Sequence, residues 1–319
     1  MPLPAVTRDW REHVPRAAPF TGVILCPPEH FAVIDVKNAF MAGQLGAVDR
    51  ARAAAQWSAL AACYRSLGVK VHVLPAAAGL EDMVFTANPA LVVPRACEAP
   101  PSGPAADAVL SRMNHASRQA EVGHLASWLA DAGLAPRELP AEAGHLEGHG
   151  DVLVVPGRRL LLGGHGGRSE PRALAALAEL LAVPLVPLAL HGEPFYHLDT
   201  CLAVLDEDTL LLHPPAFHAD ALDALADLFP RWIEADAAEA REQLACNVHA
   251  LRDGHVLVPA GARRTAAALA ARGYRPVPLD LSEFHRSGGS VFCLKLELPD
   301  LPAAGLRTAG VVRSPVPPE

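Results

Sequence analysis

A cysteine near the C-terminal end of the chain follows a pair of glycines, in the stretch Gly288-Gly289-Ser-Val-Phe-Cys293. Glycines let the backbone approach a ligand closely, and a cysteine at a strand start beyond such a loop can be partly exposed, as a reactive thiolate must be. Cys293 is therefore a candidate nucleophile. The alternative is an inert core thiol, which is the commoner state of a single cysteine.

A histidine lies two residues before an aspartate in Phe195-Tyr-His197-Leu-Asp199-Thr-Cys201. If this segment enters a strand, alternation places His197, Asp199 and Cys201 on one face, where the carboxylate can orient or charge the imidazole. This predicts His197 as a general acid and base; a surface histidine beside an aspartate is the alternative. Cys201 is a rival nucleophile, but a strand position favours the core.

Glu147 stands between two histidines in His145-Leu-Glu147-Gly-His149-Gly-Asp151. Two histidines four residues apart can bind a metal on a helix, but the glycines at 148 and 150 make a helix improbable here. We therefore expect no metal. A carboxylate displayed in a pocket is the better interpretation of Glu147, and a turn with solvated charges is the alternative.

Two further segments carry groups suited to an amino-acid ligand. Asp82 and Asn88 flank an apolar run with Phe85, whose ring could stack on a flat cationic or amide group. Arg118 and Arg168 could bind a carboxylate through both guanidinium nitrogens. The alternatives are a polar loop before a buried strand and solvated surface charges.

Three stretches of the second half follow one plan, beginning near residues 151, 201 and 247. Each has two short apolar runs joined by a turn, then an Ala/Leu-rich helix, then a short strand. The helices are expected at 171–182, 219–228 and 263–272, and the closing strands at 183–188, 231–234 and 274–278. A unit recurring about every 50 residues indicates a repeat architecture.

The first half fits the same plan more loosely, which allows about five units. Its expected strands cover 22–26, 69–74 and 90–94, and its expected helices cover 48–66 and 114–132. Five units around an axis predict a closed α/β propeller with a central pocket. A doubly wound parallel sheet is the alternative, but it lacks the antiparallel pairs that tight hairpins imply.

We expect residues 1–20 to form an N-terminal arm, 21–298 a single catalytic propeller domain and 299–319 a Pro-rich tail. The chain has 319 residues and a formal charge of -8, and its basic residues are scattered, which argues against a nucleic-acid partner. No apolar run is long enough for a membrane span, and charges at the start exclude a signal peptide, so a cytoplasmic location is expected. Six cysteines without a C-x-x-C pair argue against a zinc knuckle or a disulfide framework.

Taken together, these segments resemble the guanidino-group-modifying superfamily, which includes arginine deiminases, dimethylarginine dimethylaminohydrolases, amidinotransferases and arginine dihydrolases. The resemblance runs from about residue 22 to 298, and five motifs appear in the order of the family. They are Cys26-Pro-Pro-Glu-His, Asp82-Met-Val-Phe-Thr-Ala-Asn88, Glu147-Gly-His-Gly-Asp151, His197-Leu-Asp199 and Gly288-Gly-Ser-Val-Phe-Cys293.

The resemblance implies the five-fold pseudo-symmetric α/β propeller known as the pentein fold. It also implies Cys293 as nucleophile and His197 as acid and base, with Asp199 supporting His197 or touching the substrate. Glu147 and Asp82 would then grip the reacting nitrogens. Arg168 and Arg118 would hold the amino-acid end of the substrate.

The chain departs from the family pattern at several positions. Asn88 stands where guanidinium-binding members usually have an acidic residue, and Asn38 together with Asn88 is more similar to the arginine dihydrolase branch. Asn38 is followed by Ala39-Phe40 where Pro-Trp is usual, and Lys295 replaces a usual threonine. A neutral ureido substrate such as citrulline therefore becomes conceivable.

The sequence thus predicts a cysteine hydrolase, without metal or cofactor, that cleaves a C–N bond in the guanidino or ureido group of an arginine-like amino acid. One alternative is an amidinotransferase, whose first half-reaction is the same. Another is a non-catalytic binding protein on the same fold. The sequence leaves open which substrate is used, whether one or two hydrolysis steps occur, and whether the chain forms a homo-oligomer.

Overall fold

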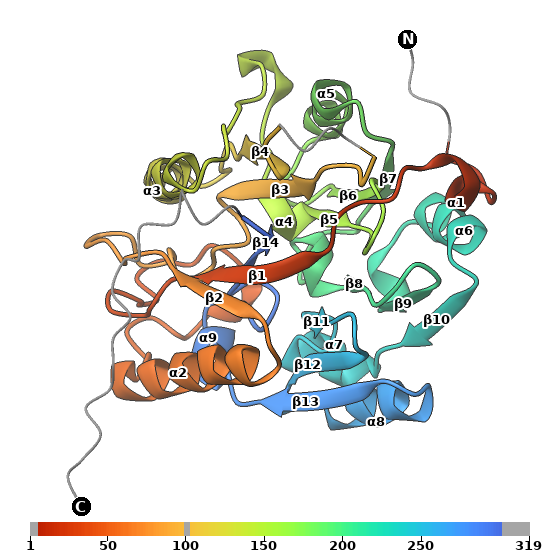
Figure 1. Cartoon of the computed structure of the whole chain (residues 1–319). Coiled ribbons are helices and arrows are strands. Elements are labelled where there is room, and N and C mark those ends of the chain that lie inside the picture. The colour runs from red at the N-terminus through yellow and green to blue at the C-terminus, as the bar shows by residue number, and fades with distance from the viewer. Residues whose placement is uncertain (1–5, 99–102, 302–319) are drawn as a thin grey trace, which may run out of the picture.

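The computed structural model of the chain describes residues 6–98 and 103–301, and within them the strands form five small sheets (Figure 1). The strands are β1 (Phe20–Leu25), β2 (Lys70–Val73), β3 (Ala90–Pro94), β4 (Ala106–Leu110), β5 (Val152–Val154), β6 (Leu161–His165), β7 (Leu185–Ala189), β8 (Leu202–Val204), β9 (Thr209–Leu212), β10 (Arg231–Glu234), β11 (His249–Ala250), β12 (His255–Pro259), β13 (Arg275–Leu279) and β14 (Leu296–Pro299). The α-helices are α1 (Trp10–His13), α2 (Arg50–Ser66), α3 (Gln119–Asp131), α4 (Gly148–Asp151), α5 (Pro171–Leu181), α6 (Ala219–Leu228), α7 (Ala237–Gln243), α8 (Arg263–Ala271) and α9 (Ser282–His285).

The second half of the chain follows the predicted plan of strand, strand, helix, strand. In the order β5-β6-β7, the middle strand pairs antiparallel with the strand before it and parallel with the strand after the helix. The sheets β8-β9-β10 and β11-β12-β13 repeat this arrangement. A tight turn allows the antiparallel pair, and the helix supplies the crossover that a parallel pair needs.

The two ends of the described chain meet in one sheet. Strand β1 pairs antiparallel with β14 and parallel with β2, so that Val23 faces Glu297 on one side and Val71 on the other. This pairing carries the segment that ends at Cys293, just before β14, to the N-terminal half of the molecule.

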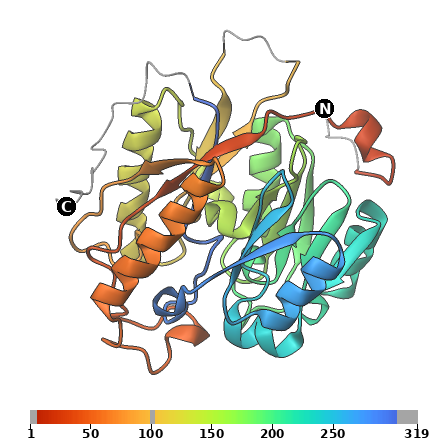
Figure 2. The same cartoon turned by 60° about the horizontal axis from the view of Figure 1, so that its bottom comes forward.

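Helices cover the outside of the sheets, and strands lie toward the middle (Figures 1 and 2). Helix α2 begins where the side chain of Asp49 accepts a hydrogen bond from the Arg52 amide, which is a common N-cap. Helix α5 begins with Pro171 at its first position, where no amide hydrogen is needed, and buries Leu174 and Leu177. Each such leucine contributes about 1.5–3 kcal/mol of burial.

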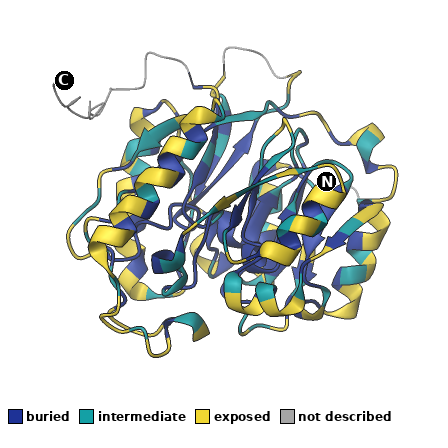
Figure 3. Ribbon diagram, turned by 90° about the horizontal axis from the view of Figure 1, so that it is seen from below, coloured by how far each residue is buried: buried dark blue, intermediate teal, exposed yellow. Residues whose placement is uncertain are grey.

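Burial follows the same division (Figure 3). All five residues of β3 are buried, whereas the helices keep an exposed outer face. The largest apolar cluster lies around β8 and β9 and includes Leu202 and Leu211. A site placed among the inner strands is therefore held by rigid, well-packed elements.

The structure differs from the expectations in three places. The Gly-rich segment after Glu147 does form one helical turn, α4, because Gly148 can adopt a positive φ of 50° and the Gly150 amide bonds the Glu147 carbonyl. Residues 198–200 form a 3-10 turn instead of entering a strand, and Cys293 precedes β14 by a turn.

Residues 6–19 of the expected N-terminal arm lie against the sheets, where Trp10 is buried and its indole N–H donates to the Leu228 carbonyl. Residues 1–5 of the arm and 302–319 of the expected tail lie outside the described residues. Among the helices that the structure describes, none has the length and apolarity that crossing a membrane requires.

Candidate active site

One polar cavity collects residues from segments that are distant in sequence. Its lining is Lys37, Asn38, Met41, Asp82, Phe85, Asn88, Arg118, Arg168, Tyr196, His197, Ser287, Gly289 and Cys293. Eight of the ten predicted site residues are in this set. The other two, Glu147 and Asp199, lie directly behind His197 and Cys293 and bond to them.

Cys293 is held as a neutral thiol with two polar partners. Its Sγ donates to Asp199 Oδ2 at 3.0 Å and accepts from Asn247 Nδ2 at 3.1 Å. Burial, together with the negative charge of Asp199, raises the Cys293 pKa well above its ordinary value. We expected a partly exposed thiol, but Cys293 is only 2% exposed, so its reactivity has to come from a ligand in the cavity.

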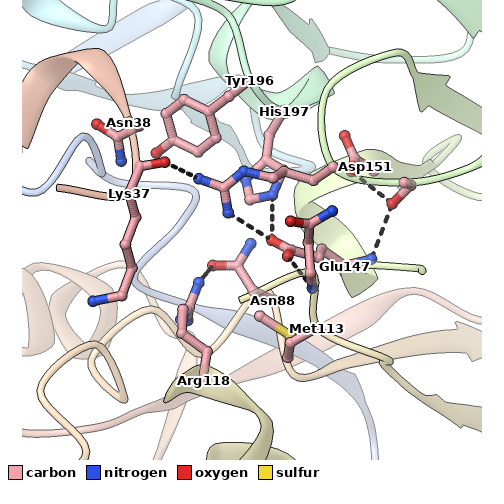
Figure 4. A network of polar contacts seen from close by, with 12 residues as sticks. Lys37, Asn38, Asn88, Met113, Arg118, Glu147, Asp151, Tyr196 and His197 are labelled. Carbon is pink, nitrogen blue, oxygen red and sulfur yellow. Dashed lines mark hydrogen bonds and ion pairs between the residues drawn. The ribbon is translucent and has the colours of Figure 1, made fainter. Parts of the chain in front are cut away.

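Figure 4 shows His197 directed at Glu147, with His197 Nε2 and Glu147 Oε2 2.7 Å apart. Burial alone would lower the His197 pKa, but the carboxylates of Asp151, Glu147 and Asp199 raise it. Burial would raise the Glu147 pKa, but the hydrogen bond and charge of His197 lower it. These carboxylates therefore favour the protonated imidazole, whose Nδ1 has no hydrogen-bond partner among the described residues.

The expectation that strand alternation pairs Asp199 with His197 is wrong. The 3-10 turn at 198–200 replaces strand alternation, so Asp199 bonds Cys293 while Glu147 bonds His197. Cys201 turns into the apolar core, where its Sγ contacts backbone carbonyls. Burial raises the Asp199 pKa to about 6, which places its titration near neutral pH.

Asn88 stands beside the reactive pair. A Cβ built on Gly150 would lie 2.4 Å from Asn88 Nδ2 and 3.0 Å from His197 Nδ1, so only glycine leaves room for both side chains. Asn88 Oδ1 accepts from Arg118 Nη1 at 3.1 Å, whereas Nδ2 has no partner among the residues described. The amide is thus oriented with its N–H groups free.

Neighbouring side chains leave no room for a Cβ at either glycine before Cys293. At Gly288, with φ 85°, a Cβ would lie 2.9 Å from both Asn38 Oδ1 and Tyr196 Oη. At Gly289 a Cβ would lie 2.2 Å from a ring atom of Phe85. The glycines therefore bring the Cys293 turn against Asn38 and Phe85, the two predicted binding residues on this side.

The two predicted arginine clamps differ in availability. Arg118 is buried against Glu121, with Nη2 to Oε2 at 2.8 Å and Nε to Oε1 at 3.0 Å. Arg168 Nη2 donates to the Lys37 carbonyl at 2.7 Å, and its guanidinium carbon lies 5.0 Å from the Tyr196 ring centroid. Arg168 Nη1 also lies 3.5 Å from Glu147 Oε2, so both arginines have a carboxylate partner, but Arg118 holds its partner through two shorter contacts.

Asp82 is bound by a lysine that the sequence analysis missed. Lys37 Nζ lies 3.1 Å from Asp82 Oδ2 and 2.9 Å from Glu81 Oε1, and it also contacts Asp35. Ser287 Oγ donates to Asp82 Oδ1 at 3.1 Å. Asp82 therefore faces a primary ammonium in this structure.

Asn247 is a second residue that was missed. Its Oδ1 accepts from the backbone amides of Ser290, Phe292 and Cys293, while Nδ2 bonds the Cys293 sulfur. One signal could have found it, because Asp151, Asp199 and Asn247 are equally spaced and each lies at the start of a repeat unit.

The histidines around Glu147 do not form a pair. His149 bonds the backbone of Val92, and His145 Nδ1 lies 3.1 Å from Glu170 Oε1. Over the described residues, no group of three or more His, Cys, Asp or Glu side chains is placed to hold a metal ion.

Comparisons with known proteins agree with this geometry. Residues 27–299 match the family model "N,N dimethylarginine dimethylhydrolase, eukaryotic". The N(G),N(G)-dimethylarginine dimethylaminohydrolase of Mycobacterium tuberculosis is 38% identical over 86% of this chain and 84% of that protein. The bifunctional arginine dihydrolase/ornithine cyclodeaminase ArgZ of Synechocystis is 33% identical over 91% of this chain and 40% of its own length.

Solved structures give the same result. The N-terminal domain of ArgZ, crystallised as a mutant bound to its substrate, matches with a TM-score of 0.79 and 32% identity over 87% of this chain and 98% of that chain. The same domain has also been solved covalently bound to a reaction intermediate. The dimethylarginine dimethylaminohydrolase of Pseudomonas aeruginosa shares the fold, with a TM-score of 0.69 and 22% identity. From the family model and these relatives, the chain belongs to the dimethylarginine dimethylaminohydrolase family.

Proposed function

We propose that this protein is a cysteine hydrolase that cleaves a C–N bond in the guanidino group of arginine or a methylated arginine. The observation that carries the proposal is that one cavity is lined by Cys293 and His197, each bonded from behind by a carboxylate. Nucleophilic substitution at a guanidino carbon needs a nucleophile and an acid that protonates the leaving amine, and both line this cavity.

In the first step Cys293 Sγ forms a bond to the guanidino carbon. The thiol is neutral in the free protein, so a cationic guanidinium beside it supports ionisation, with Asp199 Oδ2 positioned to accept the proton. His197 then gives its proton to the departing amine as the C–N bond breaks. An amidino-thioether on Cys293 remains.

In the second step water attacks the same carbon. His197 is now neutral and accepts one proton of this water, and the C–S bond breaks to release a ureido product. Asp199 returns its proton to the Cys293 sulfur, and the second water proton leaves with the amine released in the first step. Glu147 stabilises the imidazolium at both stages through its 2.7 Å contact. Its buried carboxylate also suits a grip on a reacting nitrogen, as predicted.

We assign the amino-acid end of the ligand to the other side of the cavity. Asp82 already binds a primary ammonium, which favours the α-ammonium of the ligand over the reacting nitrogens predicted for it. Arg168 keeps a 3.5 Å contact with Glu147, and its other nitrogen Nη2 donates to the neutral Lys37 carbonyl, which a ligand carboxylate can replace with a stronger charge-assisted bond. Phe85 and Asn38 would line the path between the two ends.

We also propose that the five sheets are the blades of a closed five-fold pseudo-symmetric propeller. Contacts between β14 and β3, β5 and β8, and β8 and β11 support this arrangement. The 2.9 Å contact of His249 on β11 with Glu297 on β14 supports closure of the ring.

A substrate panel with separate detection of ammonia, methylamines, citrulline and ornithine tests the function. We expect citrulline with ammonia from arginine, or with methylamines from methylated arginines, and loss of turnover in Cys293→Ser. Ornithine with ammonia would indicate a second hydrolysis of the ureido group.

Two outcomes would contradict the proposal. Amidinated product in the presence of glycine or ornithine would indicate an amidinotransferase. Absence of turnover on the whole panel, with a Cys293 that haloacetamidines do not alkylate, would indicate a binding protein.

A further inference from the structure

Lys37 contacts both groups that we assign to the amino-acid end of the ligand. Its ammonium is bound to Asp82 at 3.1 Å, and its backbone carbonyl accepts from Arg168 Nη2 at 2.7 Å. Figure 4 shows Lys37 extended along this side of the cavity, with its carbonyl and its ammonium at opposite ends. One residue thus presents a primary ammonium and an oxygen acceptor where an α-amino acid presents the same two groups.

We infer that Lys37 is an internal competitor of the substrate, which occupies the amino-acid subsite in the free enzyme and has to leave when an α-amino acid binds. This inference rests on the proposed function and on the assignment of Asp82 to the α-ammonium. Lys37 would then be a determinant of specificity, because an α-amino acid has to replace the contacts of Lys37 with Asp82 and Arg168.

The electrostatics of the contact suit a competitor. The Lys37 side chain is 3% exposed, so the Lys37–Asp82 attraction is weakly screened by water. Burial would lower the Lys37 pKa, but Asp82, Asp35 and Glu81 raise it, so the ammonium stays charged at neutral pH. A ligand that lacks a positive group cannot take the place of Lys37 on Asp82, because expelling the lysine would leave a buried carboxylate unpaired.

The segment that carries Lys37 lacks regular structure and is fixed at a few points. Residues 32–38 form no helix or strand, and Ile34 and Val36 are 65% and 55% exposed, whereas Val33 and Asn38 are buried. Segments with few buried apolar contacts open with a small fraction of the global unfolding free energy. The lysine is therefore attached to a part of the chain that can withdraw it.

The consequence is a two-point requirement on the ligand. A free α-amino acid replaces the Lys37 ammonium on Asp82 and the Lys37 carbonyl on Arg168. An analogue without the α-amino group cannot replace the ionic contact that Lys37 makes with Asp82. Lys37 should therefore reduce the net gain that the α-amino group provides, because arginine exchanges one cation on Asp82 for another, and removing Lys37 should increase the preference for arginine over such an analogue.

The kinetic test compares arginine with 5-guanidinopentanoate, its analogue without the α-amino group, in wild type and Lys37→Met. We expect the KM for arginine to fall about fivefold or more in the variant, because the competitor is gone and Asp82 is vacant. The KM for the analogue should stay within about twofold, since in wild type it binds with Lys37 still on Asp82 and in the variant it gains no contact with Asp82. An arginine KM that rises or stays constant in folded Lys37→Met would overturn the inference.

Asp35→Asn provides a second variant should Lys37→Met fold poorly. Asp35 is half-exposed, and its side chain contacts the Lys37 ammonium. Its loss should weaken the hold on Lys37 with little effect on the core. We expect a smaller fall in the arginine KM in the same direction. An unchanged or increased KM would count against the inference.

Chemical labelling gives a readout that does not depend on turnover. In Cys293→Ser, saturating arginine should expel Lys37 and raise its rate of acetylation by acetic anhydride at least threefold, as followed by peptide mass spectrometry. Lys70, which is exposed and remote, serves as the internal control. Protection of Lys37 that is unchanged or greater with arginine bound would overturn the inference. If wild type turns over no substrate and Cys293→Ser does not bind arginine by calorimetry, the proposed function fails first.

Discussion

Two buried clusters of polar and titratable side chains are built around Cys293 and Lys295. They differ in how many of their polar atoms have hydrogen-bond partners. The Cys293 cluster consists of Cys293, Asp199, His197, Glu147 and Asn88. In it, His197 Nδ1, Asp199 Oδ1 and Asn88 Nδ2 have no partner among the described residues. These atoms belong to or adjoin the cavity, so a ligand can satisfy them.

The Lys295 cluster consists of Lys295, Glu297, His249, Tyr64 and His149. Lys295 Nζ bonds Glu297 Oε2 at 2.7 Å, His249 lies 2.9 Å from Glu297, and Tyr64 lies 2.9 Å from His249. Burial lowers the pKa of Lys295 and that of His249. His149 Nδ1 is the one atom of this cluster without a partner in the part of the chain that the structure describes.

The comparison shows that burial and shifted pKa values alone do not identify an active site. Both clusters are buried and both contain perturbed groups, which structural ion pairs also produce. Both also border a cavity, which His249 and Glu297 line for the Lys295 cluster. What separates them is that the Cys293 cluster keeps three polar atoms without partners, whereas the Lys295 cluster forms a nearly complete chain of contacts among the described residues. The first is arranged for a ligand and the second for stability.

The largest expected effect is on turnover in Cys293→Ser. We expect kcat to fall by about 10⁴-fold or more, because an alcohol in this site is a far weaker nucleophile than a thiol. The free energy of unfolding should change by less than about 1 kcal/mol, as measured by urea denaturation. Cys97→Ser, at an exposed position, is the matched control and should retain wild-type turnover.

The converse prediction concerns Lys295→Met. Removing the ammonium leaves Glu297 buried without its partner, which should lower the free energy of unfolding by about 3–5 kcal/mol. Lys295→Met/Glu297→Gln should recover part of this loss in the same urea experiment. A fall in kcat/KM above 100-fold in the folded single variant would break the comparison, because Lys295 would then act in catalysis.

The pH dependence of kcat/KM tests the roles of Asp199 and His197 in the Cys293 cluster. The Asp199 pKa is raised to about 6, so below that pH its carboxylate becomes protonated and cannot accept the thiol proton. The neighbouring carboxylates raise the His197 pKa, which favours the imidazolium acid, and this acid is lost on the alkaline side as His197 deprotonates. We expect a bell-shaped profile with an acid limb near pH 6. In Asp199→Asn the acid limb should disappear while the alkaline limb stays, and an unchanged acid limb would exclude Asp199 as its source.

The smallest effect is expected for Asn88→Asp. The carboxylate would keep the contact with Arg118 and add a negative charge beside the reacting group. We expect the KM for cationic arginine to fall by up to about tenfold and that for neutral citrulline to stay or rise, as read from steady-state kinetics on both compounds. An equal change for the two substrates would show that charge at residue 88 does not set the preference.

Much of the fold and part of the site could be predicted from the sequence. The strands at 90–94 and 231–234 and the helix at 219–228 have the predicted bounds, because apolar periodicity and turn residues are local properties. The one-turn helix after Glu147 was missed, because its glycines are tolerated only where the Glu147 carbonyl and the Ala87 backbone supply the bonds.

The sequence by itself determined the repeated elements, their order and the chemical types that the cavity needs, since these depend on neighbours along the chain. The tertiary structure alone decided the partners. It placed Asp199 on Cys293, Glu147 on His197 and Lys37 on Asp82, pairs that no local pattern encodes. The physical reason is that pairing depends on how β14 returns to β1 and on which side chains desolvate together, and both are set by packing across the whole molecule.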